Sequence, residues 1–170
     1  RSGGIRLHYD TKFETVTGLK EGILLEVGFD DTTPNAPCDV SSWVLDYAED
    51  KLREITNNRA MKVPCYNPGY TFVEKLQTVS TKFKKQRESG QFGVNFMRHY
   101  YDIYQLLGNR TVQDFIGSDA YVARKDKRFR AGDEKVISKN EAFVMSDDEV
   151  RKLYEKQYDQ TSALYFHAKP

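Results

Sequence analysis

Two stretches of this 170-residue chain, residues 71–87 and 95–107, constrain its fold more than any other. In each stretch, apolar side chains recur every three or four positions, which is the spacing of one face of an α-helix. These residues are Phe72, Leu76, Val79 and Phe83 in the first stretch, and Phe96, Tyr100, Ile103, Tyr104 and Leu107 in the second. A polar link over residues 84–93 joins them. The sequence therefore predicts a pair of packed helices connected by a mobile surface loop.

Spacing of polar residues indicates where these helices begin and end. Thr71 and Glu74 have the spacing of a capping box, in which each side chain bonds the backbone NH of the other residue. Gly108 predicts the end of the second helix, because glycine often terminates helices. Ser146 and Glu149 repeat the capping-box spacing and predict the start of a last helix.

The chain before the helix pair alternates apolar and polar residues, as half-buried strands do. We expect strands over 5–9, 22–29 and 60–66, a loop over 32–37, a helix over 40–55, and further helices over 111–117 and 147–163. The expected apolar face of the helix over 40–55 consists of Val44, Tyr47, Ala48 and Leu52. Since strands come first and helices follow, the sequence predicts an α+β fold with a helical C-terminal half, divided between residues 1–66 and 67–170.

Composition excludes some classes of protein. The net charge is +1, so a basic field over the whole surface is absent and any nucleic-acid-binding patch must be local. No apolar run approaches the roughly 20 residues that span a bilayer, and no signal peptide opens the sequence. Two scattered cysteines, Cys38 and Cys65, favour reduced thiols and a cytoplasmic location. The opening residues 1–4 lead straight into a strand-like run, so we expect an upstream portion to be missing.

Charged residues at three places are candidates for chemistry. Glu26 on the strand over 22–29 is a candidate Mg²⁺ ligand, since carboxylates commonly hold this ion, or else a solvent-facing glutamate. Lys75 is a candidate phosphate-binding lysine, or else an exposed helix lysine. Arg98 and Asp102 are four residues apart and lie on one side of their helix. They form either a surface ion pair, or a catalytic site in which Asp102 orients Lys75 or another site group, or acts as a base, while Arg98 contacts phosphate.

A basic run offers a separate nucleic-acid-binding possibility. It consists of Arg124, Lys125, Lys127, Arg128 and Arg130, with Tyr121 and Phe129 available for stacking on bases. The alternative is a solvated charged face. The short motifs of P-loop, Rossmann, zinc-protease and serine-hydrolase sites do not occur in the sequence.

Three segments together resemble a known family. The succession GILLEVGF (22–29), YTFVEKLQTV (70–79) and NFMRHYYDIYQLL (95–107) is similar to the later half of the AbiEii-type nucleotidyltransferases. These are toxins of bacterial abortive-infection and type IV toxin–antitoxin systems. The resemblance implies a polymerase-β type nucleotidyltransferase sheet, here partial, fused to a helical region. It also implies transfer of a nucleoside monophosphate from an NTP to an acceptor, tRNA in some members, with Mg²⁺ as cofactor.

The resemblance implies roles for individual residues. Lys75 matches the family's nucleotide-binding lysine, and Glu26 falls near a strand carboxylate that would hold metal. Asp102 and Arg98 match the second aspartate and the arginine of the R-D-x-x-D motif. The first aspartate of that motif is His99 here, which puts any chemistry needing that carboxylate in question but leaves a residue able to bind phosphate or carry a proton.

One family feature is absent from the sequence. The opening motif, a G-G or G-S turn followed by D-x-D on a strand, supplies the principal metal carboxylates and does not occur in these residues. We therefore expect the chain alone to be inactive, as either a C-terminal portion or a degenerate relative. The rival hypothesis is a non-catalytic module that binds nucleic acid or a partner through residues 124–130. The sequence leaves contact with an antitoxin open.

Overall fold

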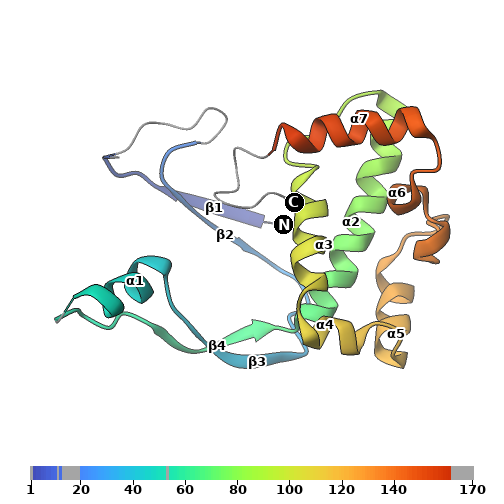
Figure 1. Cartoon of the computed structure of the whole chain (residues 1–170). Coiled ribbons are helices and arrows are strands. Elements are labelled where there is room, and N and C mark those ends of the chain that lie inside the picture. The colour runs from blue at the N-terminus through green and yellow to red at the C-terminus, as the bar shows by residue number, and fades with distance from the viewer. Residues whose placement is uncertain (1, 11, 13–19, 53, 162–170) are drawn as a thin grey trace. The chain divides into compact units, whose positions relative to one another are not determined.

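The computed structural model describes residues 2–10, 12, 20–52 and 54–161. The chain divides into two compact units, residues 1–32 and 33–170, a division that differs from the predicted boundary between residues 66 and 67. The described part contains seven α-helices and two small antiparallel sheets, which confirms the α+β prediction (Figure 1). None of its helices is both long and apolar enough to cross a membrane.

The first unit is a two-stranded antiparallel sheet. Its strands are β1 (Ser2–Leu7) and β2 (Ile23–Gly28), paired so that Ile5 lies opposite Leu25. Both strands were predicted from their alternating pattern. Every described side chain of β2 is exposed, including the apolar ones and Glu26. Two strands alone provide no second layer, so neither face of this sheet forms a core.

A second sheet opens the larger unit. Strand β3 (Asn35–Val40) pairs antiparallel with β4 (Ala60–Tyr66), with an irregularity between Cys38 and Val40. The predicted loop over 32–37 is therefore wrong from Asn35 onward. The prolines of this segment suggested a loop, but both strands of a two-stranded sheet are edge strands, where proline is tolerated. Pro37 lies opposite Pro64 in the pairing.

Helix α1 (Trp43–Lys51) lies between these strands in the sequence. Ser42 caps it by accepting a hydrogen bond from the backbone NH of Leu45. Leu45 is also the buried residue of this helix, whereas Val44 and Tyr47 are exposed. The predicted apolar face is therefore wrong. The helix buries a single leucine, so the periodic pattern did not identify the side that packs.

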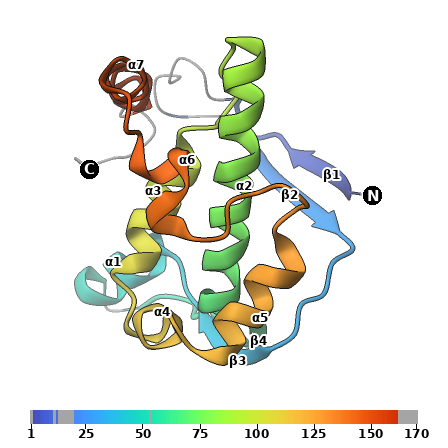
Figure 2. The ribbon, with the colours of Figure 1, turned by 90° about the vertical axis from the view of Figure 1, so that its right-hand side faces the viewer.

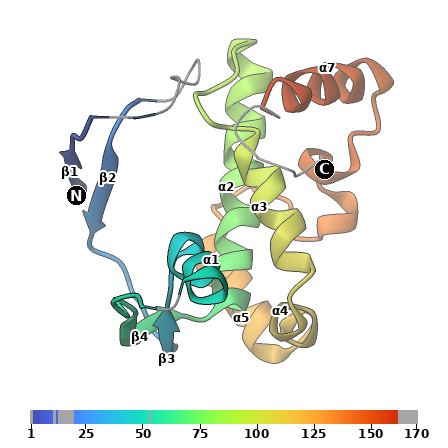
Figure 3. The same ribbon diagram turned by 60° about the vertical axis from the view of Figure 1, so that its left-hand side comes forward.

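The helical region is built around α2 (Pro68–Ser89). Helix α3 (Arg98–Leu107) packs along it, α4 (Arg110–Phe115) and α5 (Asp119–Arg128) lie near its N-terminal end, and α7 (Asp148–Asp159) crosses near its C-terminal end (Figures 1, 2 and 3). A short turn, Ile137–Lys139, and α6 (Glu141–Val144) precede α7. One apolar cluster joins these helices. It contains Phe72, Val73, Leu76, Val79, Phe96, Met97, Ile103, Val112, Tyr121, Phe129, Ala142, Val150 and Tyr154. The predicted helix pair is confirmed as α2 and α3.

The start of α2 differs from the predicted capping box. Asn67 caps the helix by accepting from the backbone NH of Gly69, and Pro68 occupies the first turn, where its missing NH is harmless. Thr71 therefore lies inside the helix. Gly69 is buried, and a Cβ added there would lie 2.6 Å from Phe115, so α4 can approach α2 this closely only at a glycine.

Other boundaries also differ from the predictions. Helix α2 continues to Ser89, so six of the ten residues of the predicted mobile loop are helical, and Gly90 caps the helix in a left-handed conformation. Asp147 caps α7, while Ser146 bonds Glu141, so the predicted cap of the last helix is wrong by one residue. Val150 and Tyr154 are the buried apolar residues of that helix, which ends at Asp159, four residues before the predicted end at 163; residues 162 and 163 lie outside the described residues. The helix α5 was not predicted.

Candidate functional site

An ion pair joins α2 to α3, and it is formed by the two principal candidate residues, Lys75 and Asp102. Lys75 Nζ donates a hydrogen bond to Asp102 Oδ2 over 2.6 Å. The side chains keep 30% and 33% of their exposure, so solvent and ligands can reach both. The predicted proximity of these residues is thus present in the fold. An ammonium group has three donors, and only one of them is used by this bond.

His99 lies beside this ion pair. Its Nδ1 is 3.9 Å from Asp102 Oδ2, and this nitrogen is buried without a hydrogen-bond partner among the described residues. Burial, followed by the positive charges of Lys75, Lys82 and Arg98, lowers the pKa of His99 to about 4, against the smaller raising effect of the Asp102 carboxylate. The imidazole is therefore neutral near pH 7.

The charges around His99 favour an anion. Lys75, Lys82 and Arg98 contribute three positive charges, whereas Asp102 contributes one negative charge. Arg98 is exposed, and within the described residues Asp102 forms its ion pair with Lys75, while the neutral His99 lies 3.9 Å away. The alternative of a simple Arg98–Asp102 surface pair is therefore not what forms. Lys82 was not predicted, although its position seven residues after Lys75, two helical turns further on, was the available signal.

The neighbour of Lys75 on α2 makes a different kind of contact. Glu74 accepts a short hydrogen bond from the Arg124 guanidinium and another, of 3.0 Å, from the Tyr66 hydroxyl. Arg124 also donates to that hydroxyl over 2.6 Å, and its guanidinium carbon lies 5.4 Å from the ring centre of Tyr70. Only 4% of the Arg124 side chain is exposed. This cluster fastens the end of β4 to α2 and α5.

The basic run is therefore less available than its sequence suggested. Arg124 is buried and bonded to Glu74, so its contact with nucleic acid would require this bond to open, and the contact stays a prediction. Lys125 donates to the Lys135 carbonyl over 3.0 Å, and Arg128 lies 3.7 Å from Glu74. The residues expected to stack on bases, Tyr121 and Phe129, belong to the buried core. Lys127 and Arg130 are exposed, and contact of either with nucleic acid stays a prediction.

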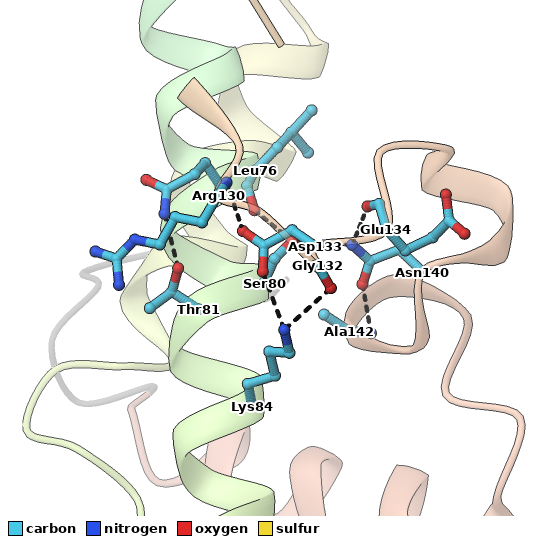
Figure 4. Close-up of polar contacts among 11 residues, drawn as sticks. Leu76, Ser80, Thr81, Lys84, Arg130, Gly132, Asp133, Glu134, Asn140 and Ala142 are labelled. Atoms are coloured by element: carbon cyan, nitrogen blue, oxygen red, sulfur yellow. Dashed lines mark hydrogen bonds and ion pairs between the residues drawn. The ribbon is translucent and has the colours of Figure 1, made fainter. Parts of the chain in front are cut away.

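A second polar cluster fastens the segment before α6 to α2 (Figure 4). Asn140, which is buried, donates to the hydroxyl of Ser80 over 3.0 Å and to the Glu134 carbonyl over 2.8 Å. Lys84 Nζ lies 3.3 Å from Asp133 Oδ1. The contacts with α2 join residues 49 and 60 positions apart along the chain, so periodicity could not pair them. The cluster is satisfied within the fold, which indicates a structural role.

The acidic candidate on β2 belongs to the other unit. Glu26 is exposed, and its strand lies in residues 1–32, whereas the Lys75 cluster lies in residues 33–170. Within the described residues, no group of three or more His, Cys, Asp or Glu side chains has the arrangement of a metal site. The Asp102 carboxylate is held by an ammonium group. The magnesium prediction stays a prediction.

The structure thus shows an α+β chain with a partly exposed cationic cluster on two adjoining helices. Comparison with known families identifies the class of protein. A sequence model described as "Nucleotidyl transferase AbiEii toxin, Type IV TA system" matches residues 1–170, the whole chain. The chain therefore belongs to the AbiEii family of nucleotidyltransferase toxins. No curated protein and no solved structure matches it significantly.

Proposed function

We propose that this chain carries the nucleotide-binding helices of a nucleotidyltransferase, with the α2–α3 edge holding the triphosphate of an NTP. The observation that carries the proposal is the ion pair between Lys75 and Asp102, 2.6 Å long and about one-third exposed. Membership of the AbiEii family supports the class of reaction. The acceptor proposed for the transferred nucleoside monophosphate is an RNA such as tRNA.

Lys75 binds phosphate in this proposal, and Asp102 positions it. The bond to Asp102 fixes the direction of the ammonium group and leaves two of its donors for phosphate oxygens. Lys82 and Arg98 add the positive charge that a triphosphate requires. A lysine acts on phosphate as a compact point charge, and the ion pair with Asp102 fixes where the Lys75 charge lies.

His99 takes the place of the family's first motif aspartate. A carboxylate there would reduce the positive charge of the cluster by one, whereas the neutral imidazole leaves it unchanged. With a pKa of about 4, His99 is not a cation near pH 7. We propose that it donates a ring N–H to a phosphate oxygen, a contact that a carboxylate cannot make.

The reaction itself is an in-line displacement. An acceptor hydroxyl attacks the α-phosphorus of the NTP, a new phosphorus–oxygen bond forms, and the bond to pyrophosphate breaks. A bound metal ion would supply positive charge that offsets the charge developing on the phosphates in such a transfer. Glu26, which lies in the unit of residues 1–32, stays a proposed Mg²⁺ ligand.

The proposal is tested by calorimetric titration of the chain with tripolyphosphate and with each of the four NTPs. Lys75→Met should weaken binding of all five ligands by about 10-fold or more, because one charged phosphate contact is lost. Lys152→Met is the matched control, since this substitution removes the same charge from an exposed position on α7. Equal effects of the two substitutions, or no binding by the unchanged chain, would contradict the proposal.

The rival hypothesis of a basic-stretch binding module has less support. Arg124 is buried against Glu74, and its two expected stacking aromatics are buried as well. Salt dependence separates the two hypotheses. Binding of RNA through residues 124–130 should fall log-linearly with salt and should not respond to NTP.

A further inference from the structure

The two cysteines of the chain are distant in the sequence, but they lie on the two strands of one sheet. Cys38 is on β3 and Cys65 is on β4, and both thiols are free. In the antiparallel pairing, Cys38 lies opposite Val63, and Cys65 lies opposite Ala36. Opposite residues, and residues two positions apart, share a face of a sheet, so the two cysteines are diagonal neighbours on one face. The function proposed above makes no use of them.

The side-chain contacts bring the two sulfur atoms together. Cys38 Sγ donates a weak hydrogen bond to the Ala36 carbonyl over 3.7 Å, so this thiol leans along β3 toward the residue that faces Cys65. Val63 and Cys65 are half-buried while Pro64 between them is exposed, as expected of residues that share one face. Partial burial, followed by a hydrogen bond with the Cys38 thiol, raises the pKa of Cys65. Each thiol is therefore within reach of the other.

Two thiols in contact are the arrangement from which a disulfide forms. We propose that Cys38 and Cys65 are the site of a reversible oxidative modification, an intramolecular disulfide formed by exchange with a low-molecular-weight disulfide such as oxidised glutathione. The Cα atoms of diagonal neighbours are typically about 7–8 Å apart, and most disulfides join Cα atoms less than about 7 Å apart. Closing the bond therefore draws the two strands together. Strained and exposed disulfides are the ones that thiols reduce easily, so this link is reversible.

Cys38 reacts first, because its side chain is exposed whereas Cys65 is half-buried. The Cys38 thiolate attacks one sulfur of oxidised glutathione, the sulfur–sulfur bond breaks, and a mixed disulfide forms as one glutathione thiolate leaves. The Cys65 thiolate then attacks the Cys38 sulfur, the bond between the two cysteines forms, and the second glutathione thiolate leaves. The two cysteine protons end on the two glutathione thiols. Two protein thiols are thus oxidised, and one small disulfide is reduced.

The link forms at the end of the sheet that is bonded to α2. Tyr66 follows Cys65 and donates to Glu74 over 3.0 Å. Asn67, which caps α2, donates its backbone NH to the Pro34 carbonyl over 3.0 Å. Oxidation therefore cross-links the two strands next to the start of α2.

The ratio of two oxidation products tests the proposal. The reduced full chain is treated with oxidised glutathione, once folded and once in concentrated urea, at a concentration where both products form. After tryptic digestion, mass spectrometry compares the linked species with the species that carries glutathione on both cysteines. Trypsin cleaves after Lys51 and Lys62, so only a disulfide keeps the two cysteines joined.

The ratio reports proximity, because the Cys65 thiol makes either product and its own reactivity cancels. The ratio should be at least about 10-fold higher for the folded chain, in which the two thiols are already in contact. It should not depend on protein concentration, and dithiothreitol should restore both thiols.

Two serine variants complete the test. Cys65→Ser should stop at the mixed disulfide on Cys38, and Cys38→Ser should take up glutathione several-fold more slowly, because the remaining thiol is half-buried. Equal product ratios for the folded and the unfolded chain would overturn the proposal, as would a disulfide that joins two chains instead of closing within one.

Discussion

Glu74 and Lys75 are neighbours on α2, yet their ion pairs differ in the burial of the partner residue and in the groups that complete the contact. Glu74 bonds Arg124, whose side chain is 4% exposed, and a tyrosine completes the contact. Lys75 bonds Asp102, and both side chains are about one-third exposed. A buried pair is expensive to break, because the remaining charge is left without compensation, whereas an exposed pair contributes little. The comparison indicates that Glu74 holds the helices together and that Lys75 is available to a ligand.

Breaking the buried pair should have the largest effect. Arg124→Met leaves Glu74 without its main partner and should lower the free energy of unfolding by about 3 kcal/mol, measured by urea denaturation. The double variant Arg124→Met, Glu74→Leu removes both charges and should recover part of this loss. If Arg124→Met alone changes stability by less than Asp102→Asn does, the contrast between the two pairs is wrong.

Acid should destabilise the chain through His99. Its pKa is about 4 in the folded chain and near 6.5 when unfolded, so its contribution to stability is complete above pH 6.5. As the pH falls from 6.5 toward 4, the unfolded chain binds a proton that the folded chain does not. This should cost up to about 3 kcal/mol, at roughly 1.4 kcal/mol for each unit of pKa difference.

The variant His99→Gln isolates this contribution, because carboxylates also titrate in that range. The difference in unfolding free energy between the unchanged chain and the variant should narrow or reverse across pH 6.5 to 4. A constant difference over the whole range would show that His99 titrates alike in the folded and unfolded chain.

The exposed pair should have the smallest effect on stability. Asp102→Asn should change the free energy of unfolding by less than about 1 kcal/mol, because solvent screens a pair of this exposure. The same substitution should weaken tripolyphosphate binding, since Lys75 loses the group that positions it. A large loss of stability without a change in binding would assign Asp102 to the framework instead.

Local patterns predicted some of these features and missed others for physical reasons. The apolar spacing in α2 and α3 located the core residues Phe72 and Leu76, and it brought Lys75 and Asp102 to adjoining helices. The partnership of Glu74 and Arg124 could not be predicted, because 50 residues separate them and no period relates them. The strand β3 was missed since its pairing with β4 depends on partners outside its own sequence.

The N-terminal cap of α2 and the buried side of α1 also could not be predicted from local spacing. Two side chains compete to cap α2, and Asn67 does so because Pro68 and Gly69 already continue the helix backbone. In α1, Leu45 is buried whereas Val44 and Tyr47 are exposed. Which side of a short helix is buried depends on tertiary packing, and the apolar spacing within the helix does not predict it. Predictions based on spacing were therefore better for long helices than for short ones.

Chemical labelling of lysines is the most direct test of the central claim, that the ammonium group of Lys75 meets phosphate. Acetylation of each lysine can be followed by mass spectrometry with and without tripolyphosphate. The ligand should protect Lys75, with Lys82 protected to a lesser degree and Lys152 unchanged. Equal reactivity of Lys75 in both conditions, at a tripolyphosphate concentration that saturates the chain, would contradict the account.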